Sequence, residues 1–174
     1  MHFELSEEQA LIQDAARKFA DDRLKPHAAQ WDEDKHFPVD VLREAAEMGF
    51  AGIYTREDVG GSAMSRVDAA LIFEQLSRGC VSTAAFISIH NMVSWMIDSW
   101  GNDEQRQRWL PEMTRMDKIA SYCLTESGAG SDAPRPRLSS RMTRARDAKC
   151  SATGSKSSMF RVSPARQSKG TPLP

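Results

Sequence analysis

The residues best suited to chemistry lie in one run, from Tyr122 to Asp132 (YCLTESGAGSD). Most of its second half is small residues, and glycine allows a backbone to approach a flat or phosphorylated ligand closely. The hydroxyls of Thr125 and Ser131, with exposed backbone amides, can bind oxygen atoms of a ring or a phosphate. Because glycine-rich turns after strands are common without any ligand, a purely structural turn stays open as the alternative interpretation.

The charged residues divide the chain into an acidic body and a basic tail. Residues 1–133 hold 13 Lys+Arg and 23 Asp+Glu, whereas residues 134–174 hold 10 Lys+Arg and a single acidic residue, Asp147. The net charge of −1 is therefore the cancellation of two opposite parts. A basic tail can attract nucleic acid or anionic lipid, but this one has one aromatic residue, Phe160, and no helical face of charge. Nucleic acid is therefore not a favoured partner.

Several classes of protein and site are excluded by what the sequence lacks. No window approaches the roughly 18 consecutive apolar residues of a membrane-spanning helix. The first residues are acidic and contain no apolar core, so no signal or transit peptide is predicted. The odd number of cysteines fits reduced thiols in a cytosol-like compartment. The three cysteines form no C-x-x-C pair, and the four histidines show no metal spacing.

Hydrophobic periodicity predicts about five helices, with Ser6, Ser65, Ser82 and Asn102 as the cap residues at which four of them begin. The predicted helices cover approximately residues 7–22, 38–48, 66–78, 83–100 and 103–110, and the first has a short continuation after Pro26. In the first helix the apolar stripe is Leu11, Ala15 and Phe19, with Ile12 and Ala16 beside it. The fourth helix is apolar nearly all round, which is typical of a helix at the centre of a bundle.

The pattern changes after residue 117. Residues 118–125 (KIASYCLT) alternate as a β-strand does and lead into the glycine-rich run. One strand is not a stable sheet, so the sequence predicts a β domain that starts and is not completed. From Pro134 onward no period persists, and the tail is predicted to be disordered. The predicted fold class is thus mainly α, with a helical domain at 1–117, the start of a β domain at 118–133 and a disordered tail at 134–174.

The glycine-rich run resembles the signature of the acyl-CoA dehydrogenases, flavoproteins that oxidise acyl-CoA thioesters. The similarity extends over residues 3–132 in family order, through FELSEEQ, FPVDVLREAAEMGF at 37–50, DVGGS at 58–62, FISIHNMVSWMI at 86–97 and GNDEQRQRWLP at 101–111. The segment FISIHNM most resembles the short, branched-chain members of the isobutyryl-CoA dehydrogenase type.

This resemblance implies an N-terminal helical domain, a middle β domain and a C-terminal helical domain, with FAD between the last two in a homotetramer. The flavin-binding residues would be Tyr122, Cys123, Leu124, Thr125, Glu126, Ser127, Gly128, Ala129, Gly130 and Ser131. Leu124 and Thr125 would lie nearest the ring, and Ser131 would also contact the acyl-CoA substrate. An electron-transfer flavoprotein would be the partner, no metal would be needed, and the pathway would be fatty-acid or branched-chain amino-acid breakdown. The location would be the cytoplasm in a bacterium or the mitochondrial matrix in a eukaryote.

The chain also departs from the family pattern. Ser127 stands where the family usually has proline, which loosens the turn slightly. After Ala133 the match ends, and the family's second flavin segment is not found. The catalytic base of the family is a glutamate of the C-terminal domain, so no catalytic residue is assigned here, and Glu126 is not taken as the base. We therefore expect a frameshift or truncated gene after Ala133 and a chain that is inactive by itself.

Two other functions stay open beside that of an oxidoreductase. One is a helical interaction module without catalysis, and the other is an anion- or nucleic-acid-binding protein that acts through its tail. Within the fourth helix, His90 and Asn91 are interpreted as hydrogen-bonded core residues rather than ligands. Met92, Trp95 and Met96 are interpreted as packing residues, although the acyl-chain pocket of the family lies close to this helix.

Overall fold

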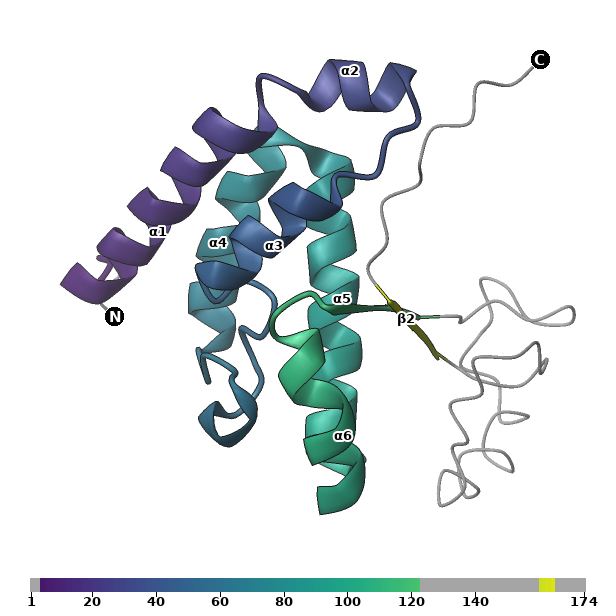
Figure 1. Ribbon diagram of the computed structural model, residues 1–174. Coiled ribbons are helices and arrows are strands. Elements are labelled where there is room, and N and C mark those ends of the chain that lie inside the picture. Colours follow the sequence, from purple (N-terminus) through teal and green to yellow (C-terminus); the bar gives the residue numbers. More distant parts are fainter. Residues whose placement is uncertain (1–3, 123–159, 165–174) are drawn as a thin grey trace, which may run out of the picture.

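A computed structural model describes residues 4–122 and 160–164 of the chain (Figure 1). Its helical elements are α1 (Glu7–Phe19), the π-helical η1 (Ala20–Leu24), α2 (Ala28–Glu33), α3 (Val39–Glu47), the 3₁₀ turn η2 (Glu57–Val59), α4 (Arg66–Gly79), α5 (Val81–Trp100) and α6 (Asp103–Met113). The strands are β1 (Lys118–Tyr122) and β2 (Phe160–Pro164). The described part is therefore mainly helical, as the sequence predicts.

Three helices begin at their predicted caps. In each of them the side chain of the cap residue accepts a hydrogen bond from the backbone N–H of the residue three positions later. The side chain of that later residue accepts from the backbone N–H of the cap residue. The three pairs are Ser6–Gln9 at α1, Ser65–Asp68 at α4 and Asn102–Gln105 at α6. The Gln9 side-chain amide also donates to Asp68 Oδ1 at 3.1 Å, so the starts of α1 and α4 are tied together.

Two helix boundaries differ from the prediction. α5 begins directly after Cys80, which is its N-cap in place of the predicted Ser82, and no side chain caps it. α6 does not break at Pro111 but continues through it to Met113. Proline removes one backbone N–H, and this loss is tolerated near the helix end because the side chains of Leu110 and Met113 are completely buried.

The buried face of α1 is rotated from the predicted stripe. Leu11 is 72% exposed and Ala15 is also exposed, whereas Ala16 and Phe19 are buried and Ile12 packs against the core. Two neighbouring stripes in this helix have helical spacing, and the sequence pattern does not separate them. Packing of α1 against α4 selects the stripe that contains Ala16.

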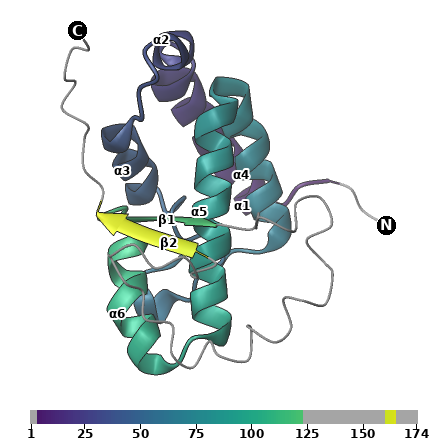
Figure 2. The same cartoon turned by 90° about the vertical axis from the view of Figure 1, so that its right-hand side faces the viewer.

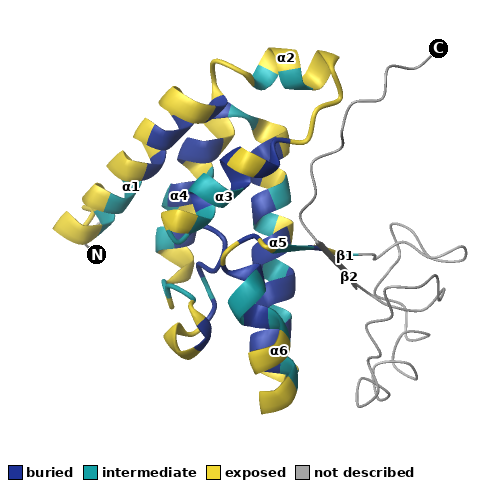
Figure 3. Ribbon diagram, in the orientation of Figure 1, coloured by how far each residue is buried: buried dark blue, intermediate teal, exposed yellow. Residues whose placement is uncertain are grey.

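The fourth predicted helix, α5, packs against α4, α6 and β1, but one of its faces is open, where Ile89 and Trp100 are exposed. The larger core lies between α1, α3, α4 and the first half of α5. A smaller core lies between the second half of α5, α6 and β1. Figure 3 shows the buried residues on the inward faces of these helices.

Five residues of the tail form the strand β2, and for residues 160–164 the prediction of disorder is wrong. β2 pairs with β1 in an antiparallel arrangement, with Ala120 opposite Val162 and Tyr122 opposite Phe160 (Figure 2). A lone strand leaves its backbone N–H and C=O groups without partners, and pairing with β2 satisfies those on one edge of β1. Five residues without a sustained period cannot be told from a loop by pattern alone. The other residues of the tail lie outside the described ranges.

Candidate functional site

The predicted ligand-binding run starts at the end of β1. Tyr122, its first residue, is also the last residue of β1 and is half-buried. It packs against the smaller core, which includes Val93 of α5 and Leu110 of α6. The other predicted site residues, Cys123–Ser131, lie outside the described residues. The structure therefore describes how the strand that leads into the run is held.

His90 of α5 holds β1 through main-chain hydrogen bonds. Its Nδ1 accepts from the backbone N–H of Ala120, with 3.1 Å between the nitrogens. Its Nε2 donates to the backbone carbonyl oxygen of Met113, the last residue of α6, at 3.0 Å. Because an amide N–H can only donate and a carbonyl can only accept, the imidazole is neutral and carries its hydrogen on Nε2.

The surroundings of His90 keep it neutral. The side chain is completely buried, and this burial lowers the pKa of His90 to about 4, against an opposing effect of the Met113 carbonyl. The ring of Phe86, one turn earlier on α5, lies with its centroid 6.2 Å away. The interpretation of His90 as a hydrogen-bonded core residue is thus confirmed, and its partners are main-chain groups.

Asn91 fixes the loop that follows α3. Its side chain is completely buried, and its Oδ1 accepts from the N–H of Ile53 at 2.7 Å. Its Nδ2 donates to the carbonyl oxygens of Phe50 at 2.7 Å and Ile87 at 2.9 Å. Two consecutive polar residues of α5 therefore anchor two different segments, the loop at 50–53 and the strand β1.

Buried charges hold the second half of α5 against η2 and α6. Asp98 accepts from Arg106 Nε at 2.8 Å and from the backbone N–H of Arg56 at 3.1 Å. Arg106 also donates to both carboxylate oxygens of Asp58 at 2.8 Å. Burial alone would raise the pKa of Asp98, but hydrogen bonds from Arg106 and Arg56 outweigh it and lower the pKa. The carboxylate therefore stays ionised at neutral pH.

The outward face of α5 carries apolar side chains that the described residues cover only in part. Met92, Trp95 and Met96, interpreted from the sequence as packing residues, are half-buried, and Trp100 is 66% exposed. The rings of Trp95 and Trp100 meet edge to face with centroids 5.0 Å apart, and the Arg66 guanidinium lies 4.9 Å from the Trp95 centroid. A surface of this kind is suited to being covered by further protein or by an apolar ligand.

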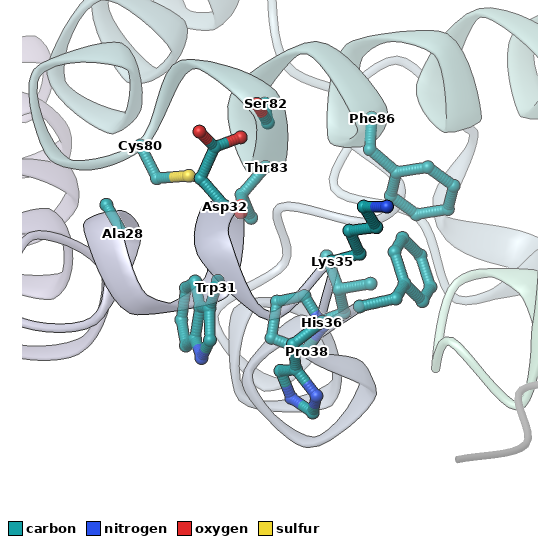
Figure 4. Close-up of a pocket in the computed structure, with 12 residues that line it drawn as sticks. Ala28, Trp31, Asp32, Lys35, His36, Pro38, Cys80, Ser82, Thr83 and Phe86 are labelled. Atoms are coloured by element: carbon teal, nitrogen blue, oxygen red, sulfur yellow. Dashed lines mark hydrogen bonds between the residues drawn. The ribbon is translucent and has the colours of Figure 1, made fainter. Parts of the chain in front are cut away.

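A pocket of about 240 Å³ lies between α2 and the first turns of α5 (Figure 4). Most of its walls are aromatic or aliphatic, and its lining residues are Ala28, Trp31, Asp32, Lys35, His36, Phe37, Pro38, Leu42, Cys80, Ser82, Thr83 and Phe86. The rings of Phe37 and Phe86 meet edge to face at 4.8 Å between centroids. The sequence did not predict this pocket, because its walls come from segments far apart in the chain. The aromatic residues after α2 were the one local signal.

Residues 4–122 and 160–164 contain neither a cluster of metal-binding side chains nor a helix that could span a membrane. No three His, Cys, Asp or Glu side chains are grouped as a metal site would require. None of the helices in these ranges has the length and apolar character needed to cross a bilayer.

Comparison with known proteins gives consistent matches. The model of the acyl-CoA dehydrogenase N-terminal domain matches residues 6–117. The mitochondrial isobutyryl-CoA dehydrogenase of Dictyostelium discoideum is 57% identical over 129 residues, and that of Bos taurus is 54% identical over 129 residues. Each match covers 74% of this chain and 31% of the relative, so the chain spans about a third of the length of these curated relatives.

The fold is also similar to that of solved structures. An acyl-CoA dehydrogenase from Bacillus anthracis, determined in complex with FAD, matches with a TM-score of 0.68 and 33% sequence identity. The match covers 75% of this chain and 22% of that chain.

Proposed function

Since the chain belongs to the acyl-CoA dehydrogenase family, we propose that it forms the N-terminal part of a FAD-dependent oxidoreductase. The substrate would be a short, branched acyl-CoA such as isobutyryl-CoA, which is oxidised between its α- and β-carbons. In this proposal, residues 1–117 are the helical domain and residues 118–133 begin the middle β domain.

The observation that carries the proposal is the identity of 57% over 129 residues to an isobutyryl-CoA dehydrogenase. This value is well above the 33% identity to the FAD-bound Bacillus anthracis structure. The branched-chain relatives are therefore the better guide to the substrate. The alternatives of a helical interaction module and of an anion-binding tail have no comparable support.

The residues proposed to hold FAD are Tyr122–Ser131, with Leu124 and Thr125 nearest the ring and Ser131 also at the acyl-CoA. When bound, FAD accepts a hydride from the β-carbon of the substrate. Two properties of this chain fit that role. The run is rich in glycine and hydroxyl side chains, so its backbone can approach a flat ring. The strand β1, which ends at Tyr122, is also anchored at Ala120 by the buried imidazole of His90.

The wider assembly also belongs to the proposal. We propose a homotetramer that passes electrons to an electron-transfer flavoprotein, and the partly uncovered apolar face of α5 supports packing against further protein. The two relatives named above are mitochondrial, which supports the matrix as the location in a eukaryotic cell. No residue of this chain is proposed as the catalytic base.

The proposal can be tested with a chimera. Residues 1–131 replace the matching third of bovine isobutyryl-CoA dehydrogenase, and the purified product is assayed for bound FAD and for reduction of an electron acceptor by isobutyryl-CoA. We expect the chimera to bind FAD and to oxidise isobutyryl-CoA faster than butyryl-CoA, while the unmodified chain reduces no acceptor. A Thr125→Val chimera is the matched variant, and we expect it to bind FAD more weakly.

Two results would count against the proposal. A folded chimera without FAD would show that this sequence does not supply a flavin segment. Turnover of isobutyryl-CoA by the unmodified chain would contradict the proposal that the catalytic base lies outside this chain.

A further inference from the structure

The two edges of β1 are held by different partners. β2 pairs with one edge in an antiparallel arrangement. The backbone N–H of Ala120 donates to His90 Nδ1, so this amide is not available to β2. The N–H groups of successive strand residues point to opposite edges. The imidazole therefore occupies the position at Ala120 where a further strand of the sheet would bind.

Both partners of His90 are main-chain groups from different elements. Met113 ends α6 and Ala120 lies in the middle of β1, and they are 23 and 30 residues away from His90 in the sequence. A main-chain group cannot rotate away as a side chain can. One rigid ring with a donor and an acceptor therefore links α5, the end of α6 and β1.

The residue of β1 that lies opposite His90 decides which side chains of the strand are buried. Ala120 is buried and Ser121 is exposed, as the two faces of a strand require. A slip by one residue would exchange these faces and bring Ser121 into the core. The hydrogen bond to Nδ1 fixes the place of the strand, and burial of Ala120 rather than of the polar Ser121 selects the register at that place.

We propose that His90 is a positioning residue that holds β1 in place against α5 and α6, and thereby sets the position of Tyr122 at the end of the strand. The consequence for flavin binding rests on the proposed function, whereas the position of β1 does not. The pKa of about 4 supports this role, because the imidazole keeps the same hydrogen-bonding pattern across physiological pH.

Three variants of the full chain test the proposal. His90→Phe keeps a ring but removes the donor and the acceptor. His90→Gln restores both on a flexible side chain. Leu24→Ala is the matched control, because it opens a cavity in the larger core within η1. Amide exchange of residues 118–122 is measured by mass spectrometry. The affinity for FAD is measured by quenching of flavin fluorescence, with the same variants placed in the chimera.

We expect His90→Phe to speed exchange in residues 118–122 by about tenfold or more, because a buried amide loses its partner. His90→Gln should recover most of the protection. In Leu24→Ala, residues 118–122 should exchange no faster than the other core residues do. If His90→Phe does not fold, His90→Asn takes its place, since Asn is too short to reach both main-chain partners.

The outcomes separate the two claims. Unchanged exchange of residues 118–122 in His90→Phe would overturn the positioning role, whatever the protein binds. A chimera with the wild-type sequence that binds no FAD would count against the proposed function, and exchange alone would then decide the role of His90. If the chimera binds FAD, we expect His90→Phe to weaken the affinity for FAD about tenfold and Leu24→Ala to leave that affinity unchanged. Equal weakening by both variants would overturn the link between His90 and the flavin segment.

Discussion

Asp98 of α5 and Arg106 of α6 form a buried ion pair, with 2.8 Å between Oδ1 and Nε and side chains that are only 5% and 7% exposed. Arg106 also binds Asp58, and Asp98 also binds Arg56, so the pair ties α5 and α6 to η2 and the residue before it. Removal of one partner from a buried pair leaves the other charge without full compensation.

Arg106→Met should therefore lower the free energy of unfolding by about 3 kcal/mol or more. The double variant Asp98→Asn, Arg106→Met should lose less than the sum of the two single variants, because no uncompensated carboxylate stays buried beside Arg56. Urea denaturation of the four proteins gives the coupling energy. Additive losses would show that the pair is not coupled.

The stability of the fold should fall in mildly acidic solution because of His90. The folded-state pKa of about 4 lies below the value of about 6.5 in an unfolded chain, so the unfolded chain binds more protons between these two pH values. The contribution of His90 is complete above the unfolded pKa and declines as the pH falls. Between pH 7 and pH 5 this amounts to about 2 kcal/mol. Urea midpoints of wild type and His90→Gln at both pH values measure it, and an equal pH dependence in both proteins would exclude His90 as the source.

Asn91→Ala should destabilise the protein by about 3 kcal/mol or more, because the N–H of Ile53 and the carbonyl of Phe50 lose their buried partner. Ser94→Ala is the control on the same helix. Ser94 is equally buried but donates only to the carbonyl of His90 within α5, and we expect its loss to cost less than about 1 kcal/mol. Similar denaturation curves for the two variants would contradict this account of the loop.

Gly61→Ala should be among the most damaging small substitutions in the loop before α4. A Cβ atom at Gly61 would lie 2.0 Å from the carbonyl oxygen of Thr55, so the backbone must move. Ala63→Gly provides a contrast two residues away, since Ala63 has a φ of 48° and glycine adopts this conformation without strain. Thermal unfolding should show a large loss for Gly61→Ala and no loss, or a gain of up to about 1 kcal/mol, for Ala63→Gly. A normal melting temperature for Gly61→Ala would refute the steric explanation.

Features that depend on neighbouring residues were predictable from the sequence. The capping boxes at Ser6, Ser65 and Asn102 each involve residues three apart, so the local chain contains both partners. The apolar character of α5 likewise indicated that it packs against several other elements. The family resemblance, through runs of residues in a fixed order, was confirmed by the match over residues 6–117.

Features that depend on distant partners were decided only by the tertiary structure. The sequence contained two helical stripes in α1, and contact with α4 determined that Ala16 and not Ala15 is buried. It identified His90 as a core residue, but its partners at Met113 and Ala120 become neighbours only when α6 and β1 fold back onto α5. The strand β2 has no strong pattern of its own and exists through pairing with β1. The sequence by itself thus determined the helices and the family, because these depend on local order, whereas packing decided which faces are buried and how β1 is held.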